Sequence, residues 1–462
     1  MELLSAAARR LNLHLQGADA RYLRVVTDTR AIQPGDLFVA LKGERFDAHD
    51  FVAEAAGKGA IGALVSRAVD APIAQLLVTD TLLALQRLAA SWRAGFDLPV
   101  IGVTGSNGKT TTKQLLAAVF AARGPVLATE GNLNNHIGVP LTLLKLRQEH
   151  RTAVVEMGAS NAGEIALLAR LAQPTVGIIT QAGDAHLEGF GSREGVARAK
   201  GELFAALGRQ SKDQGAAPKG GTAIINADDA YAGLWKKLAG DNRIVSFGFA
   251  AHAEVRAEDL LSTPDGNRFK LLTPDGSAMV SLPLPGRHNI ANALAAAAAG
   301  HALGLCVDTI AEGLQKVERP KGRVVIHTLA NGARLIDDSY NANPTSLAAA
   351  MALLAKEPGQ RLLVLGDMAE LGPTADALHA RAGIEAKALG LNALLTLGPR
   401  SAEAAKSFGI GGKAFDSPEA LIEALRPQLK GAATVLVKGS RSARMERVVA
   451  ALLEQNMTEA TH

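Results

Sequence analysis

The sequence has little cysteine, few aromatic residues and no long apolar run, and each shortage excludes a class of protein. Of 462 residues, one is cysteine (Cys306) and 4% are aromatic. A single cysteine excludes an internal disulfide framework and agrees with a reducing compartment. No apolar run approaches the ~18–20 residues that span a bilayer, and Met1–Leu15 lacks the apolar core of a signal peptide. We therefore expect a cytoplasmic protein that is not embedded in a membrane.

Positive and negative charges are nearly balanced. Lys and Arg number 49 against 45 Asp and Glu, a formal net charge of +4. An excess this small over the whole chain does not predict a nucleic-acid partner. With 48% hydrophobic and 20% charged residues, the composition excludes a largely disordered chain. Cys306 has apolar flanks and no basic neighbour, so we predict a buried, unreactive thiol.

The order of apolar segments predicts three α/β domains, since 462 residues is about three domain lengths of ~150 residues. Strand–helix alternation begins at Val100 and restarts after a linker at Arg319–Gly322, which is the pattern of parallel sheets. We expect a small N-terminal α/β domain (residues 1–97), a central P-loop-type domain with a mostly parallel sheet (98–319) and a C-terminal Rossmann-like, doubly wound domain (320–462). The seams near 98 and 320 are candidate hinges.

Strands are expected where short apolar runs lie between turn residues. In the first domain these are Leu23–Asp28, Asp36–Ala40 and Ile61–Val65. In the central domain they are Val100–Thr104, Ala153–Met157, Val176–Thr180, Thr222–Asn226 and Arg243–Phe247, followed by hairpins turning at Pro264–Gly266 and Pro274–Gly276. In the last domain they are Arg334–Asp337, Leu362–Gly366, Ala393–Leu397 and Thr434–Lys438. The polar stretches Lys42–Asp50 and Gly208–Gly221 are predicted to be solvated loops.

The clearest chemical motif is Val100–Thr111, an apolar strand followed by a glycine loop and a helix that begins at the threonines. Loop N–H groups and a helix N-terminus form a cavity for phosphate oxygens, and Lys109 adds a positive charge. The Thr110 hydroxyl is suited to bind Mg²⁺. The strict P-loop pattern requires glycine at the position of Val103, so Gly105 makes a shorter loop here. We still predict nucleotide binding.

Two later strands end in side chains that suit a metal or a phosphate site. The strand at Ala153–Val155 ends in Glu156, and the next strand leads into a loop that contains His186. Open α/β sheets bind ligands at the carboxyl ends of their strands. From the residues alone, His186 is equally compatible with a metal ligand and with an ordinary polar surface group.

Motifs along almost the whole chain resemble those of the Mur ligases, ATP-dependent amide-forming enzymes of peptidoglycan synthesis. The phosphate loop is shared with folylpolyglutamate synthetases. The runs at Arg45–Phe51, Gly366–Gly372 and Val437–Ala443 are more specific, and they match the member that adds a dipeptide. Other matching segments are Thr27–Arg30, Leu37–Gly43, Gly131–Pro140, His186–Gly191, Ala197–Glu202, Gly286–Asn292 and Asp337–Pro344.

The resemblance implies a substrate for each domain, with UDP-N-acetylmuramoyl-tripeptide and D-alanyl-D-alanine as partners and the protein as a monomer. The nucleotide sugar would bind to the first domain, which makes the Lys42–Asp50 loop a binding loop. The residues implied to contact the nucleotide sugar, from the first and central domains together, are Thr29, Arg30, Lys42, Asp47, His49, Asn134 and Asn135. ATP would bind to Gly105, Ser106, Asn107, Gly108, Lys109, Thr110, Thr111, Asn289, Asn292, Arg323 and Asp338. The dipeptide would meet Tyr340, Asn341, Asn343 and Arg441.

The implied reaction needs positive charge. The ligase transfers the γ-phosphoryl group of ATP to a substrate carboxylate, and an amine then attacks the acyl phosphate. Lys109, two Mg²⁺ ions and Arg323 would offset the converging negative charges. Lys109, Glu156, His186 and Lys200 are the implied catalytic residues, and the implied metal ligands are Thr110, Glu156, His186 and Lys200. Lys200 would serve only after carbamylation by CO₂, since a cationic amine repels Mg²⁺.

Two other functions are compatible with parts of the sequence. One is another ligase of the superfamily, either a different Mur ligase or a folylpolyglutamate synthetase. The other is a regulatory P-loop NTPase, against which stand the missing glycine at Val103 and the absence of a switch segment. His136 stands where the family pattern has Asp, and neither the third residue of the tripeptide nor the base that deprotonates the amine is evident from the sequence.

Overall fold

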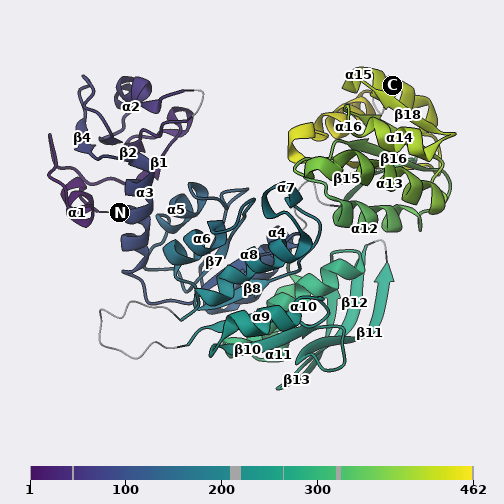
Figure 1. Cartoon of the computed structure of the whole chain (residues 1–462), viewed down its shortest axis with the longest axis horizontal. Coiled ribbons are helices and arrows are strands. Elements are labelled where there is room, and N and C mark those ends of the chain that lie inside the picture. The colour runs from purple at the N-terminus through teal and green to yellow at the C-terminus, as the bar shows by residue number, and fades with distance from the viewer. Residues whose placement is uncertain (1, 44–45, 209–219, 264, 319–323, 460–462) are drawn as a thin grey trace.

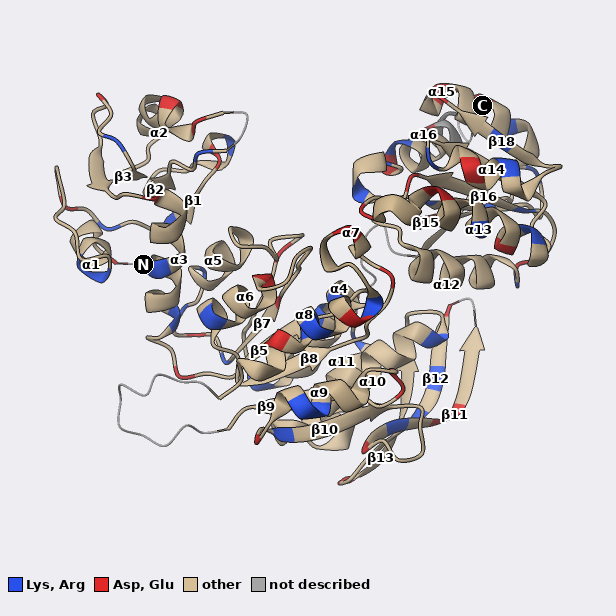
Figure 2. Ribbon diagram, viewed as in Figure 1, with Lys and Arg blue, Asp and Glu red and all other residues tan. Residues whose placement is uncertain are grey.

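The computed structural model describes residues 2–43, 46–208, 220–263, 265–318 and 324–459, and it has the three α/β domains expected from the sequence (Figure 1). Over these residues the strands form sheets of four, nine and six strands. The domains follow one another along an elongated molecule, with the central domain in the middle. Acidic and basic residues are interspersed along the ribbon of all three domains (Figure 2), in keeping with the small net charge. No described helix is long and apolar enough to cross a membrane.

The N-terminal domain is a parallel sheet in the order β1-β2-β3-β4. Its elements are α1 (Leu4–Arg10), β1 (Arg24–Val26), β2 (Asp36–Val39), α2 (Val52–Gly57), β3 (Gly62–Val65), β4 (Ala74–Leu77) and α3 (Thr81–Arg93), with 3₁₀ turns at Thr29–Ala31 and Ala48–Phe51. Asp80 caps α3 by accepting a hydrogen bond from the Leu83 amide at 2.9 Å. The helix packs against α5 and α6 of the central domain.

The central sheet has the order β13-β12-β11-β10-β9-β8-β5-β7-β6. All neighbouring pairs from β11 to β6 are parallel, and β12 and β13 add an antiparallel meander at one edge. The strands are β5 (Val100–Thr104), β6 (Val126–Ala128), β7 (Thr152–Glu156), β8 (Val176–Ile179), β9 (Thr222–Asn226), β10 (Arg243–Gly248), β11 (Val255–Thr263), β12 (Gly266–Thr273) and β13 (Gly276–Leu282). The strands β5, β7 and β8 are buried over their whole length because helices cover both faces.

The helices of the central domain place the site residues at the carboxyl edge of this sheet. They are α4 (Lys109–Phe120), α5 (Gly138–Leu143), α6 (Glu164–Ala172), α7 (Leu187–Phe190), α8 (Arg193–Ala205), α9 (Ala232–Ala239), α10 (Arg287–Ala302) and α11 (Val307–Gln315). The alanine-rich helix α10 is buried on nearly every side and packs against α4. Small side chains permit this close approach, so the amino ends of α4 and α10 both border the phosphate loop.

The C-terminal sheet has the order β14-β15-β19-β16-β17-β18, with β14 antiparallel and the other pairs parallel. Its elements are β14 (Val325–Thr328), β15 (Arg334–Asp338), α12 (Pro344–Leu354), β16 (Arg361–Gly366), α13 (Ala375–Ala388), β17 (Ala393–Leu397), α14 (Ala402–Phe408), β18 (Gly412–Phe415), α15 (Pro418–Leu425), β19 (Thr434–Lys438) and α16 (Glu446–Glu459). Two apolar clusters, one on each face, confirm the predicted doubly wound arrangement.

One prediction was wrong, and several others fall wholly or partly outside the residues that the structure describes. Cys306 is exposed at the N-cap position of α11, although its apolar neighbours along the chain, Leu305 and Val307, are buried. Its thiol lies 3.0 Å from the Thr309 hydroxyl, and hydrogen bonding at this helix start lowers its pKa. The predicted linker Arg319–Gly322 and most of the predicted loop Gly208–Gly221 lie outside the described residues.

Candidate active site

A cavity of about 450 Å³ opens between the central and C-terminal domains. The phosphate loop and the start of α10 form one side, and the segment from β15 into α12 forms the other. The predicted site residues that line this cavity are Ser106, Asn107, Gly108, Lys109, Thr110, Thr111, Asn289, Asn292, Asp338, Tyr340, Asn341 and Asn343. Residues separated by more than two hundred positions in sequence therefore share one chamber.

Two glycines allow the phosphate loop to pack tightly. Gly105 has φ of +148°, and a Cβ there would lie 1.8 Å from the Thr180 hydroxyl. Gly108 has φ of +83°, and a Cβ there would lie 2.3 Å from Asn292 Oδ1. Any larger residue would therefore clash with β-sheet or α10 neighbours as well as strain the backbone. This geometry agrees with the predicted short loop.

Lys109 is the first residue of α4, and its ammonium group folds over the loop. The Nζ donates to the Gly105 carbonyl at 2.6 Å and lies 3.5 Å from the Ser106 carbonyl. The side chain also lines the cavity. A positive charge beside loop amides and a helix N-terminus is the arrangement that favours phosphate oxygens.

The other end of the cavity is suited to an apolar, flat group. Leu284, Pro285, Phe247 and Phe249 line it together with His288. Burial lowers the pKa of His288, which favours a neutral ring at this end. Asn289 and Asn292 point into the same region; the Asn289 amide donates to the Pro285 carbonyl at 2.8 Å, and the two asparagine side chains hydrogen-bond each other at 3.2 Å.

Glu156 lies at the end of β7, beneath the start of α4. Its Oε1 accepts hydrogen bonds from Asn134 Nδ2 at 2.9 Å and from the Thr110 hydroxyl at 3.3 Å. Its Oε2 is buried without a hydrogen bond, although the Lys113 ammonium is 3.4 Å away. A hydroxyl beside a carboxylate with an unused oxygen is a donor set that fits Mg²⁺. The neighbouring Asn135 accepts a hydrogen bond from the amide of Gly138, the first residue of α5, at 2.9 Å.

His186 and Lys200 both lie near the ring of Phe190. The His186 ring lies edge-on to Phe190 with centroids 6.4 Å apart, and the Lys200 Nζ lies 5.6 Å from the centroid of the same ring. Lys200 is 1% exposed, and burial, reinforced by the charge of Lys109, lowers its pKa well below its ordinary value. His186 also forms an ion pair with Glu370 of the C-terminal domain, and this contact lowers the pKa of the Glu370 carboxyl.

The four predicted metal ligands do not share one contact: Thr110 hydrogen-bonds Glu156, whereas His186 and Lys200 each lie near the Phe190 ring. Among the described residues, no group of three or more His, Cys, Asp or Glu side chains is arranged to hold a metal. A metal in this region would therefore need the threonine hydroxyl, or a lysine converted to a carbamate, to complete its ligands.

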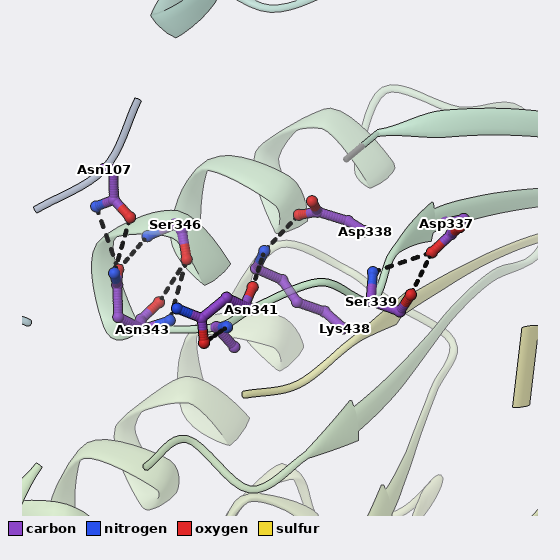
Figure 3. Close-up of polar contacts among 9 residues, drawn as sticks. Asn107, Asp337, Asp338, Ser339, Asn341, Asn343, Ser346 and Lys438 are labelled. Carbon is purple, nitrogen blue, oxygen red and sulfur yellow. Dashed lines mark hydrogen bonds and ion pairs between the residues drawn. The ribbon is translucent and has the colours of Figure 1, made fainter. Parts of the chain in front are cut away.

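The C-terminal side of the cavity is built around a buried ion pair (Figure 3). The Lys438 ammonium pairs with the Asp338 carboxylate and donates to the Asn341 carbonyl at 2.9 Å. Asn343 caps α12 and also exchanges two amide hydrogen bonds with Asn107 of the phosphate loop, at 2.7 and 3.3 Å. The phosphate loop thus touches the C-terminal domain directly.

Arg441 lies beside this loop rather than in the cavity lining. Its guanidinium is 5.7 Å from the Tyr340 ring centroid and forms an ion pair with Glu446 at 3.2 Å. Tyr340 itself does line the cavity. The arginine therefore lies near the ring of a cavity residue without lining the cavity itself.

The predicted residues of the first domain follow two adjacent parallel strands, β1 and β2. The Thr29 carbonyl accepts from Lys58 at 3.1 Å, and the exposed Arg30 pairs with Asp28 at 2.7 Å. Lys42 is exposed, and its backbone pairs with that of Asp47 in an isolated antiparallel β-bridge. These residues share one edge of the N-terminal sheet.

His49, in contrast, is 1% exposed. Its Nδ1 contacts Asp47 at 2.5 Å, and its Nε2 accepts from the Ser66 amide at 2.7 Å. Both ring nitrogens are thus engaged within the domain, so His49 has no ring nitrogen left to bind substrate directly. It ties the predicted binding loop Lys42–Asp50 to Ser66, the residue that follows β3.

Some residues of interest are outside the described part of the chain, and others were missed from the sequence. Arg323, predicted to meet the nucleotide, and Arg45 are not described. Lys438, Lys113 and Glu370 were not predicted as site residues. Lys438 and Glu370 lie within two of the motifs that carried the family resemblance, and this could have singled them out.

Comparisons with known proteins agree with this architecture. The Mur ligase family, catalytic domain, matches residues 21–93; the Mur ligase middle domain matches 103–300; and the Mur ligase, glutamate ligase domain, matches 322–441. UDP-N-acetylmuramoyl-tripeptide–D-alanyl-D-alanine ligase of Escherichia coli is 47% identical, covering 96% of each chain. The enzyme of the same name from Synechocystis is 42% identical over 95% of this chain and 94% of its own.

Solved structures are similar over nearly the whole chain as well. MurF from Acinetobacter baumannii superposes with a TM-score of 0.89 at 38% identity, covering 97% of this chain and 98% of that one. MurF ligase from Thermotoga maritima, solved with ADP, gives a TM-score of 0.79 at 28% identity and covers 94% and 98%. Fold and site together define a three-domain ATP-dependent ligase. The chain belongs to the Mur ligase family.

Proposed function

We propose that this chain joins D-alanyl-D-alanine to the C-terminal carboxylate of UDP-N-acetylmuramoyl-tripeptide, with ATP converted to ADP and phosphate. The observation that carries the proposal is the cavity in which the phosphate loop faces the β15–α12 segment. Relatives that match over nearly their whole length bear the name of this activity, at 47% and 42% identity, and the Thermotoga structure was solved with ADP.

In this mechanism the substrate carboxylate attacks the γ-phosphoryl group, ADP leaves, and an acyl phosphate forms. The dipeptide amine then attacks the activated carbonyl, and phosphate is expelled. Lys109 offsets negative charge as the phosphoryl group moves. Mg²⁺ at Thr110 and Glu156 would supply Lewis-acid neutralisation of the phosphate oxygens. The amine has an ordinary pKa near ~8 and must lose a proton before attack, and the C-terminal domain must cover the acyl phosphate to exclude water.

We assign the nucleotide-sugar end to the first domain and the dipeptide to the third. Thr29, Arg30, Lys42 and Asp47 are the candidates at the edge of the first sheet, and the limits 1–97, 98–319 and 320–462 enclose the three family matches. Around the dipeptide we expect Tyr340, Asn341, Asn343 and Arg441. A cytoplasmic location, a monomeric state and two Mg²⁺ ions stay predictions.

We further propose that Lys200 is carbamylated, which would supply a second metal carboxylate. Carbamate formation requires a neutral amine, and burial of Lys200 lowers its pKa in the direction that favours one. Activity should rise when bicarbonate is added to CO₂-depleted enzyme. Lys200→Ala should lose this response while its ATP affinity stays within about tenfold (~1.4 kcal/mol). Lys236→Ala, on the exposed end of α9, is the control and should keep the response. A bicarbonate response that persists in Lys200→Ala would contradict the proposal.

Phosphate release measured with and without D-alanyl-D-alanine tests the main proposal. Release should require both the nucleotide-sugar tripeptide and the dipeptide, whereas a regulatory NTPase would not respond to the dipeptide. Lys109→Ala should lower the rate by about 10²–10³-fold with an unchanged Tm. Folylpolyglutamate synthase, at 17% identity, shares only the fold. Activity with a folate acceptor in place of the nucleotide sugar would favour that alternative.

A further inference from the structure

Lys113 is a buried cation that the proposed mechanism does not use. It lies on α4 one turn after Thr110, and its side chain is 6% exposed. Its ammonium is 3.4 Å from Oε2 of Glu156, whose side chain is 3% exposed. Burying an ammonium group costs several kcal/mol unless a partner compensates it. Because an apolar side chain would fill this space at a lower cost, we infer that the positive charge of Lys113 has a role of its own.

The two oxygens of Glu156 have different surroundings. Oε1 accepts hydrogen bonds from Asn134 and Thr110, and Oε2 faces Lys113 without forming a hydrogen bond. Asn134 is itself fixed, because the Gly158 amide donates a hydrogen bond to its backbone carbonyl at 2.8 Å. The two residues pack so closely that a Cβ added at Gly158 would lie 2.9 Å from the Asn134 side-chain oxygen. Lys113 is thus the charged group that neutralises this carboxylate when no metal is bound.

We propose that Lys113 is a positioning residue that holds Glu156 ready for a divalent cation and limits how tightly the cation binds. The inference rests on the proposed function, in which Glu156 is a metal ligand. A fixed positive charge beside a ligand carboxylate stabilises the metal-free site and repels the incoming cation. The site would then load and release its metal with each nucleotide rather than keep it.

Substitution of Lys113 by Met, which has a similar length and no charge, tests both proposed effects of the lysine: stabilisation of the metal-free site and weaker binding of the cation. The probe is Mn²⁺, measured by its electron paramagnetic resonance signal in the presence of a non-hydrolysable ATP analogue. Lys113→Met should bind Mn²⁺ about tenfold more tightly than the unmodified chain. Its metal-free Tm should fall, and Mn²⁺ should raise that Tm by more than in the unmodified chain. Lys145→Met removes a lysine from an exposed pair with Glu130 and should change neither value.

Two further variants keep the test decisive. Glu156→Gln should weaken Mn²⁺ binding, and Lys113→Met combined with Glu156→Gln should recover much of the lost Tm because no buried charge is left unpaired. If Lys113→Met does not fold, folding of the double variant supports the inference and failure of both overturns it. Unchanged Mn²⁺ affinity in Lys113→Met, with weakened binding in Glu156→Gln, overturns the inference and leaves the metal site standing. Unchanged binding in Glu156→Gln overturns the metal site itself.

Discussion

The two junctions between domains are built differently. At the first, α3 of the N-terminal domain packs on α5 and α6 of the central domain, and one continuous apolar cluster contains residues of both, from Leu37 and Leu88 to Val139 and Leu168. The buried Arg93 at the end of α3 adds hydrogen bonds to the carbonyls of Ala172 and Gln173, at 3.0 and 3.3 Å.

At the second junction the contacts are polar and surround a cavity. Among the described residues, no apolar cluster is shared between the central and C-terminal domains. Polar contacts across this junction include the Asn107–Asn343 amide pair and the His186–Glu370 ion pair. Glu370 is half exposed, and exposed ion pairs contribute little.

Opening the two junctions would have very different energetic costs. Separating the first would expose an apolar core, at roughly 25 cal/mol for each Å², whereas separating the second exchanges a few polar contacts for contacts with water. Of the two predicted hinges, the shared core argues against the one near 98. The seam near 320 remains a predicted hinge, and it borders the proposed reaction cavity.

The largest effect is expected at the first junction. Leu88→Ala removes a fully buried side chain from the shared core and should lower the free energy of unfolding by about 2–5 kcal/mol. Urea denaturation should show the N-terminal and central domains unfolding together. Leu83→Ala, on the exposed side of the same helix, is the control and should cost little. Separate unfolding transitions for these two domains would contradict a core shared across the first junction.

Spin labels test motion directly, and the exposed Cys306 provides one attachment site in the central domain. A second label at Lys406→Cys reports on the C-terminal domain, and one at Gln33→Cys reports on the N-terminal domain. An ATP analogue and the nucleotide-sugar substrate together should shorten the Cys306–406 distance and leave the Cys306–33 distance unchanged. Equal changes in both distances would mean that the first junction also moves.

The smallest effect is expected from the second junction. Glu370→Gln removes the charge that faces His186, and it should change the free energy of unfolding by less than about 1 kcal/mol. Solution scattering of the unliganded protein should show a slightly larger radius of gyration. Glu385→Gln, which loses an exposed pair with Arg381 inside α13, is the matched control and should leave the radius unchanged. A Tm drop as large as that of Leu88→Ala would contradict the polar character of this junction.

Much of the fold could be predicted because the central strands are contiguous apolar runs with turns between them. The strands β5, β7, β8 and β9 lie within a residue or two of their predicted bounds. The short edge strands β6, β14 and β18 were not predicted, since they are partly exposed and lack a strong apolar pattern. Edge strands are defined by the neighbour with which they pair, and a single sequence does not contain that information.

The phosphate loop could be predicted from the sequence alone, because its chemistry depends on adjacent residues: a strand, two glycines, a lysine and a helix start. The sequence also carried the family resemblance on which the remaining site predictions relied. Tertiary packing brings Lys113 to Glu156 and Asn107 to Asn343. It also engages both ring nitrogens of His49 and leaves Cys306 exposed. These facts depend on how separate elements pack, and the energies that fix them come from burial and pairing across the fold rather than from neighbours along the chain.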